Sequence, residues 1–199
     1  MNRILLEACR AISVTFPRGV DGRISSAVKE GEYLDKLASA IPNQIKFEIS
    51  KARHWCDFTC EGVPFNLKLS DCKTADNAFN KTAVIYSITG QVPEIKNMNF
   101  NKFWGKIKET SWADLDGREY HYLVVNKTTG EAMIKSIFAV KSYVPNPCNI
   151  MQINWGREFE EQDYTPEDLT EKKKELLRCI QKSIRTSINS QQEFAQADI

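Results

Sequence analysis

The chain has 199 residues, and its 27 lysines and arginines against 26 aspartates and glutamates give a formal net charge of +1. Its 42% hydrophobic and 27% charged residues are typical of a globular protein and exclude collagen, a long coiled coil or wholesale disorder. The length suits one domain with a sizeable apolar core, and the balanced charge argues against binding nucleic acid by bulk charge alone.

Targeting and redox features indicate a cytoplasmic protein without a membrane partner. No window approaches the roughly 18 consecutive apolar residues of a membrane helix, and the first residues lack the pattern of a secretory signal. The six cysteines lack the spacing of a disulfide framework. His54, Cys56 and Cys60 have no second ligand cluster to complete a zinc site. We therefore expect free thiols in a reducing compartment.

The first third of the chain predicts two helices followed by strands. Apolar residues at helical spacing predict helices over 4–12 and about 25–41. Alternation of apolar and polar residues predicts strands at 45–49, 54–60 and 63–70, the last being the clearest in the chain. The tight connection Glu61-Gly62 makes the second and third of these strands a hairpin.

The remaining elements predict a single α/β unit, residues 1–199. In chain order we expect a helix from Thr74, an apolar run at 83–88, an aromatic-faced helix at 100–107, paired strands at 120–125 and 132–140, a short strand at 150–155 and a C-terminal helix over about 166–190. Lys172, Lys173 and Lys174 are expected on the solvated face of that last helix. The predicted fold is a central mixed β-sheet flanked by helices.

Three polar side chains in the hairpin, at about 54–70, carry the candidate chemistry. Because side chains alternate along a strand, Asn66 and Lys68 leave the strand on one face while Phe65 and Leu67 point into the core. Asp57 on the adjacent strand is expected close to them. Lysine and aspartate on a strand built for burial are unusual, since they are rarely buried unless paired.

Hydrolysis of a phosphodiester requires this combination of groups. A carboxylate holds Mg²⁺, which prefers oxygen ligands and lowers the pKa of a bound water. An ammonium group orients the attacking water and stabilises the charge of the transition state. The backbone carbonyl of Leu67, between the two hairpin side chains, is a further possible metal ligand.

These residues resemble a known family. Trp55-Cys56-Asp57 followed by Pro64-Phe65-Asn66-Leu67-Lys68 is similar to the active-site hairpin of the PD-(D/E)XK nucleases, in particular type II restriction endonucleases. Two positions differ: Cys56 replaces the customary proline and Asn66 replaces the acidic residue. The resemblance implies a restriction-endonuclease-like core in which Asp57, Asn66 and Lys68 are catalytic. It implies a metal site at Asp57 and the Leu67 carbonyl.

The resemblance also suggests a glutamate from the preceding helix, Glu32 (or Glu30), as a further metal ligand, although an exposed surface position is the other interpretation of Glu32. It implies Mg²⁺ as the cofactor, no nucleotide cofactor, and a homodimer in the prokaryotic cytoplasm.

Two segments downstream of the hairpin resemble EcoRV-like, blunt-cutting restriction enzymes: residues 73–80 and 149–155. Lysines can neutralise phosphates and asparagine amides can pair with base edges. For each asparagine a turn or capping role is an equal alternative. The residues expected to contact double-stranded DNA are Lys73, Thr74, Asn77, Asn80, Lys81, Asn146 and Asn149.

The sequence therefore predicts a Mg²⁺-dependent type II restriction endonuclease that cuts a short palindromic duplex site. Two alternatives stay open. One is a structure-specific DNA repair or junction-resolving nuclease. The other is a non-catalytic DNA-binding protein that retains the fold, with Asn66 as the mark of lost metal binding.

Overall fold

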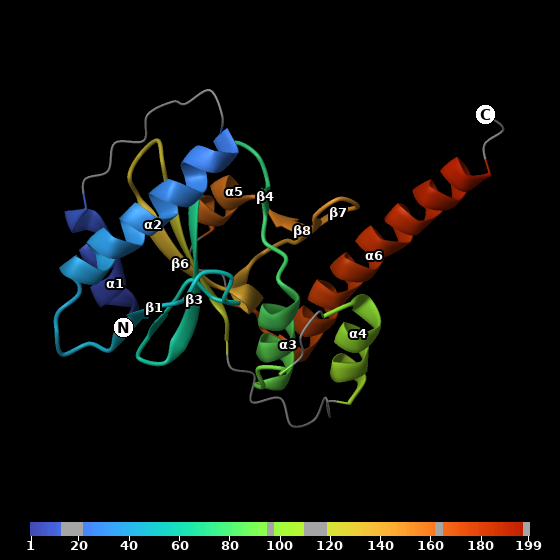
Figure 1. Cartoon of the computed structure of the whole chain (residues 1–199), viewed down its shortest axis with the longest axis horizontal. Helices are drawn as coiled ribbons and strands as arrows, with labels where there is room; N and C mark the ends of the chain where they lie inside the picture. Colours follow the sequence, from blue (N-terminus) through green and yellow to red (C-terminus); the bar gives the residue numbers. More distant parts are fainter. Residues whose placement is uncertain (13–21, 95–97, 110–118, 162–164, 197–199) are drawn as a thin grey trace.

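The chain folds into two β-sheets and surrounding helices (Figure 1). The computed structural model describes residues 1–12, 22–94, 98–109, 119–161 and 165–196. The mixed α/β class expected from the sequence is confirmed. None of the helices in these ranges is long and apolar enough to cross a membrane.

The larger sheet has five strands in the order β1-β2-β3-β5-β6. The strands are β1 (Phe47–Ile49), β2 (Phe58–Cys60), β3 (Val63–Ser70), β5 (His121–Asn126) and β6 (Ala132–Ser136). β3 and β5 are parallel, and the other neighbours are antiparallel. A parallel pair needs a long crossover, and the one between β3 and β5 contains α3 (Lys81–Thr89) and α4 (Phe100–Lys108).

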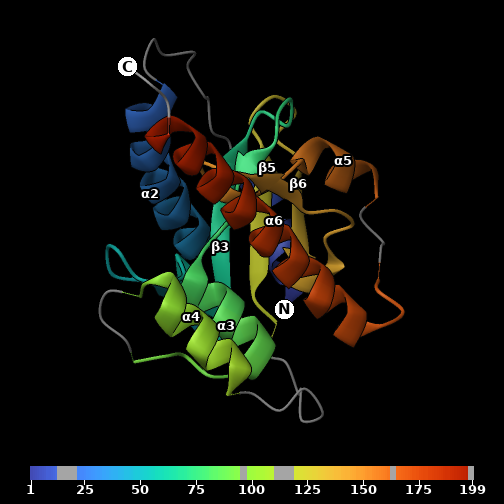
Figure 2. The same ribbon diagram turned by 90° about the vertical axis from the view of Figure 1, so that its right-hand side faces the viewer.

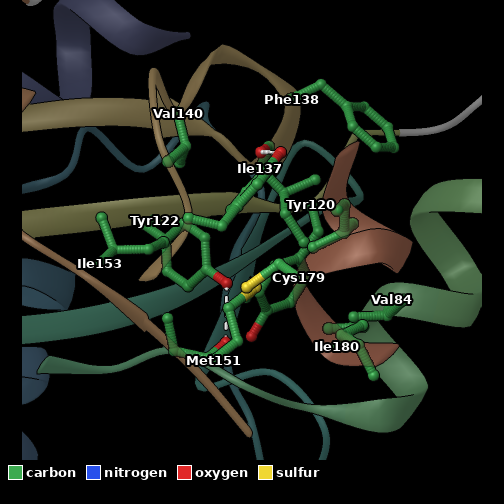
Figure 3. Close-up of a cluster of buried hydrophobic side chains, with 14 of the residues drawn as sticks. Val84, Tyr120, Tyr122, Ile137, Phe138, Val140, Met151, Ile153, Cys179 and Ile180 are labelled. Atoms are coloured by element: carbon green, nitrogen blue, oxygen red, sulfur yellow. Dashed lines mark hydrogen bonds between the residues drawn. The ribbon is translucent and has the colours of Figure 1, made fainter. Parts of the chain in front are cut away.

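Each face of this sheet is covered by its own apolar cluster. Phe65, Leu67 and Leu69 of β3 pack on one face with residues of α1 (Asn2–Ala11) and α2 (Gly22–Ala40). Tyr122 and Val124 of β5 point to the opposite face and join the second cluster, shown in Figure 3. The alternation expected for the strand at 63–70 is thus confirmed, since burying the odd-numbered residues directs Asn66 and Lys68 to the other side.

The smaller sheet forms where a helix was expected. β4 (Asp76–Asn77), β8 (Ile150–Ile153) and β7 (Val144–Asn146) lie in the order β4-β8-β7. The predicted helix from Thr74 is therefore wrong. Helix α3 begins later because Asn80 caps it, its Oδ1 accepting a hydrogen bond from the Ala83 N–H at 3.1 Å. The apolar run at 83–88 is the buried body of that helix.

The C-terminal helix α6 (Leu169–Ala195) crosses the second cluster, and its second half extends away from the other elements (Figures 1 and 2). The expectation that Lys172–Lys174 lie on a solvated face is wrong for Lys172 and Lys173, which are 3% and 0% exposed. A lysine stem packs on apolar surface while its ammonium reaches a polar group. Lys172 does so, since its Nζ donates to the Lys141 carbonyl at 2.9 Å.

Candidate active site

The candidate site lies at the edge of β3 where β2 ends. β2 pairs with β3 as far as Phe65, and beyond that residue none of the described strands lies beside this edge of β3. The side chain of Asp57 takes the place of a strand partner there, because its Oδ2 accepts a hydrogen bond from the Leu67 N–H at 2.7 Å. The expected strand at 54–60 is accordingly reduced to β2, and residues 54–57 are irregular.

The same geometry directs a backbone carbonyl to this edge. The N–H and C=O of one strand residue point the same way, and those of its neighbours point to the opposite edge. Since the Leu67 N–H points to Asp57, the Leu67 carbonyl also faces the open edge. The Asp57 N–H donates to the Phe65 carbonyl at 2.8 Å and fixes the irregular segment against the strand.

Asn66 contacts Asp57 directly, as the sequence predicts. Its Nδ2 donates to Asp57 Oδ2 at 2.5 Å. The hydrogen bonds that the described residues make to this carboxylate therefore converge on Oδ2, and Oδ1 accepts none of them. A carboxylate that is held through one oxygen in this way has its second oxygen available to bind a ligand.

The electrostatics of the site depend on burial and on Lys68. The pKa of Asp57 is raised, because desolvation is the largest influence on it. The hydrogen bond from the Leu67 N–H, the charge of Lys68 and the hydrogen bond from the Asn66 amide each lower this pKa. The ammonium of Lys68 is thus near enough to favour the ionised carboxylate. Asp57 and Lys68 are therefore close to each other, as the hairpin pattern predicts.

A second carboxylate joins this pair, and it belongs to Glu30 of α2. Desolvation raises the pKa of Glu30, the charges of Lys68 and Lys127 lower it, and the charge of Asp57 raises it. Glu32, the glutamate preferred from the sequence, is exposed. Of the two glutamates expected from the sequence, Glu30 is therefore the one near Asp57 and Lys68, and Glu32 has the exposed surface position that was its other interpretation.

A signal for Glu30 was present in the sequence. Glu30 precedes the buried residues Tyr33 and Leu34 by three and four positions, which puts all three on one helix face. Glu32 lies off that face.

The oxygen atoms at this edge suit a magnesium ion. Among the residues in the described ranges, no three His, Cys, Asp or Glu side chains gather as a metal site. Mg²⁺, however, keeps several waters and is held by one or two carboxylates together with substrate phosphates. Asp57 Oδ1, the Leu67 carbonyl and Glu30 provide hard oxygen donors of that kind.

The two segments expected to contact DNA come together in the smaller sheet. Asn77 of β4 is paired with Gln152 of β8, a residue that the sequence reasoning missed. An adjoining pocket of about 450 Å³ includes Asn77, Asn80, Lys81 and Asn149 in its lining. The pairing of strands distant in sequence gives no local signal, so Gln152 could not be identified without it.

Three of the expected DNA-contacting residues have structural roles. Asn80 caps α3 and donates from Nδ2 to the Trp55 carbonyl at 3.0 Å. Asn146 Oδ1 accepts from two N–H groups of its own loop, and its Nδ2 donates to Gln152 Oε1 at 3.1 Å. Lys81 Nζ donates to the Met98 carbonyl at 2.7 Å.

The other four expected DNA contacts are exposed. They are Lys73, Thr74, Asn77 and Asn149. Asn77 Oδ1 accepts the Phe79 N–H at 3.2 Å, so this asparagine also stabilises its own turn.

No family model matches the chain, and no match is found among curated proteins or solved structures. A fold alone does not determine function, so the groups at the edge of β3 and their environment carry the functional information in this chain.

Proposed function

We propose that the chain is a Mg²⁺-dependent type II restriction endonuclease with a PD-(D/E)XK-type, EcoRV-like core, acting in the prokaryotic cytoplasm as part of a restriction-modification system. The observation that carries this proposal is the placement of Asp57. Its carboxylate is desolvated, is fixed by the Leu67 N–H at an open strand edge, and lies near the Lys68 ammonium.

The fold supports the proposal in its broad arrangement. The antiparallel strands β1, β2 and β3 are followed by a helical crossover and the parallel strand β5, and helices cover both faces of the sheet. This is a mixed sheet flanked by helices, the arrangement expected for a restriction-endonuclease-like core. The site lies in its central hairpin.

Each residue of the site has a distinct role in the proposed reaction. Asp57 Oδ1, the Leu67 carbonyl and Glu30 would hold Mg²⁺. The bound ion would polarise the scissile phosphate and acidify a water. Lys68 orients the attacking water and balances the negative charge that develops on the phosphate. Asn66 holds Asp57 Oδ2 and so positions the carboxylate.

The substrate in this proposal is double-stranded DNA with a palindromic site, cut by a homodimer whose symmetry matches the two strands. Lys73 would contact a phosphate, because it is exposed beyond the end of β3. Asn77, Asn149 and Gln152 carry amides that can pair with base edges.

The direct test is digestion of plasmid DNA with Mg²⁺. We expect discrete, reproducible fragments from the wild-type chain and no cleavage by Asp57→Ala or Lys68→Ala, with their circular dichroism unchanged. Asp35→Ala and Lys36→Ala, on the exposed side of α2, are matched controls that should cut normally. Full activity in either site variant would refute the assigned site.

One observation favours a non-catalytic alternative. The Asn66 amide already neutralises part of the Asp57 charge by hydrogen bonding, an arrangement that holds the carboxylate without a metal. A DNA-binding protein that retains the nuclease fold would bind one sequence and cut nothing with Mg²⁺ or Mn²⁺. Cleavage of branched DNA without sequence preference would instead select the repair or junction-resolving nuclease.

A further inference from the structure

A buried tyrosine, Tyr120, immediately precedes β5 on the face of the sheet to which Asn66 points. It is 1% exposed, and its backbone carbonyl accepts the Ile137 N–H at 2.8 Å, which extends the pairing of β5 with β6 by one residue. Because β3 and β5 are parallel with Asn66 opposite Tyr122, the side chains of Asn66, Tyr120 and Tyr122 leave the sheet on one face. Figure 3 shows both tyrosines in the second cluster, which covers that face.

The hydroxyl of Tyr120 contacts the irregular segment that carries Asp57. It donates to the Trp55 carbonyl at 3.3 Å, and the rings of these two residues stack with their centroids 5.7 Å apart. Asn80 Nδ2 donates to the same carbonyl at 3.0 Å. A phenolic hydroxyl has one proton. Since Tyr120 donates that proton to Trp55, its oxygen can only accept hydrogen bonds from other groups.

Asn66 provides a hydrogen bond of that kind. Burial raises the pKa of Tyr120 well above its usual value, and the hydrogen bond with the Asn66 side chain is a weaker influence that lowers it. A hydrogen bond that lowers the pKa of a phenol is one donated to its oxygen, since it stabilises the phenolate. Asn66 Nδ2 has two protons and donates one of them to Asp57 Oδ2 at 2.5 Å. The other proton is available for Tyr120.

We propose that Tyr120 is a positioning residue of the candidate active site, which orients the Asn66 amide and, through it, the carboxylate of Asp57. An asparagine amide has a donor end and an acceptor end. Both of its partners here are acceptors, so both select the Nδ2 end, and the amide cannot exchange its two ends without losing both hydrogen bonds. The catalytic use of this arrangement rests on the proposed function, because it requires Asp57 to hold a metal ion during a reaction.

The orientation of Asn66 determines the direction of the Asp57 oxygen that is available for a ligand. Asp57 Oδ2 is held by the Leu67 N–H at 2.7 Å and by Asn66 Nδ2. The backbone donor is fixed by the strand, whereas the asparagine side chain can rotate. Without the Tyr120 hydroxyl the amide loses one of its two restraints. Removing a group that holds a metal ligand in place typically costs about 10- to 100-fold in metal affinity or activity.

The alternative is a role in stability alone, in which the ring of Tyr120 fills the second cluster and its hydroxyl holds Trp55. Tyr120→Phe separates the two roles, because it keeps the ring, and the Trp55 carbonyl retains Asn80 as a donor. Tyr143→Phe is the matched control. The Tyr143 hydroxyl is also buried and donates to a backbone carbonyl, that of Ile137, at 2.7 Å. Similar melting temperatures are expected for the two variants.

The first test follows the side-chain amide protons of Asn66 by NMR in the full chain, without Mg²⁺ or DNA. The two resonances are identified by their loss in Asn66→Asp. We expect one of them to shift upfield in Tyr120→Phe, because its hydrogen bond is removed, and both to stay in place in Tyr143→Phe. Two unmoved resonances in Tyr120→Phe would overturn the proposal, whether or not the chain cuts DNA.

The second test measures plasmid cleavage with Mg²⁺ in a single turnover. Tyr120→Phe should cut about 10- to 100-fold more slowly, while its affinity for DNA in chelator should be unchanged, because Tyr120 is buried. Tyr143→Phe should change neither. An unchanged cleavage rate in Tyr120→Phe, or a loss explained by weaker DNA binding, would overturn the positioning role. If the wild-type chain cuts no DNA, the proposed function fails, and the amide resonances still decide whether Tyr120 orients Asn66.

Discussion

Asn66 donates its side-chain amide to Asp57 Oδ2 at 2.5 Å, so the position that departs from the acidic pattern of the hairpin contacts the carboxylate directly. An amide here removes the repulsion that two carboxylates would have in the absence of a cation. It also leaves the site with one negative charge fewer for binding Mg²⁺. This single contact therefore has opposite consequences for stability and for metal affinity.

Replacing Asn66 with aspartate should reverse both consequences. With a chelator present, Asn66→Asp should melt at a lower temperature because two carboxylates then repel. Added Mg²⁺ should restore the melting temperature, and half-maximal cleavage should need about tenfold less Mg²⁺, since ligand charge increases cation affinity. Asn43→Asp, at an exposed turn, is the control that should change neither. Asn66→Asp melting that does not respond to Mg²⁺ would argue against a cation at this edge.

The buried carboxylate of Asp57 should lower the stability of the fold at neutral pH. Burial raises its pKa above the unfolded value, so the native state binds this proton more tightly. The free energy of unfolding then falls as pH rises from the unfolded pKa through the native pKa, and the loss is complete above both.

Asp57→Asn should therefore raise the melting temperature at pH 7.5 in chelator by about 2–4 °C, while abolishing cleavage. The difference from wild type should shrink as the pH falls below the native pKa of Asp57. Asp35→Asn, an exposed substitution, serves as the reference. An Asp57→Asn variant that melts below wild type at pH 7.5 would show that the ionised carboxylate stabilises the fold.

Lys73 and Lys81 should behave differently although both were expected to contact DNA. Lys73 is exposed, so Lys73→Ala should weaken DNA binding in chelator and reduce the slope of log K against log salt by about 1. Lys81 is held by the Met98 carbonyl and lies 4.4 Å from the centroid of the Phe100 ring. Lys81→Ala should instead lower stability by about 1 kcal/mol. Equal salt slopes for wild type and Lys73→Ala would exclude a phosphate contact at Lys73.

The buried ion pair between β6 and α5 (Trp155–Glu160) should be a major determinant of stability. Lys135 Nζ lies 3.2 Å from Glu158 Oε2, and the two side chains are 1% and 2% exposed. Glu158→Gln leaves a buried ammonium without its counter-charge and should reduce the free energy of unfolding by about 3–5 kcal/mol. Glu7→Gln removes a partner from the exposed Arg3–Glu7 pair and should change it by less than about 1 kcal/mol. Urea denaturation measures both, and similar losses would contradict the role given to burial.

Local pattern was sufficient to predict the active-site hairpin. The alternation at 63–70 predicts β3 and the face of each side chain, because that strand buries its odd-numbered residues against α1 and α2. The proximity of Asp57 and Asn66 follows from the short connection between the strands. The sequence left Glu32 and Glu30 as alternatives, and the burial of Tyr33, which lies on the same face of α2 as Glu30, distinguishes them.

Tertiary context determined what the local pattern missed. The residues after Thr74 have helical spacing, yet Asp76 and Asn77 pair with β8, which is distant in the sequence. Lys172 and Lys173 are charged, yet both are buried because α6 packs on the second cluster at that point. Neither the pairing of β4 with β8 nor the burial of the first turn of α6 can be predicted from a short window of residues.

Sequencing the ends of the fragments from one plasmid digest with Mg²⁺ tests the central claim most directly. A nuclease site formed by Asp57 and Lys68 should leave every end at one short palindromic sequence, and the same digest with Asp57→Ala should leave the plasmid intact. Ends scattered over unrelated sequences, or identical ends from the Asp57→Ala variant, would contradict the account.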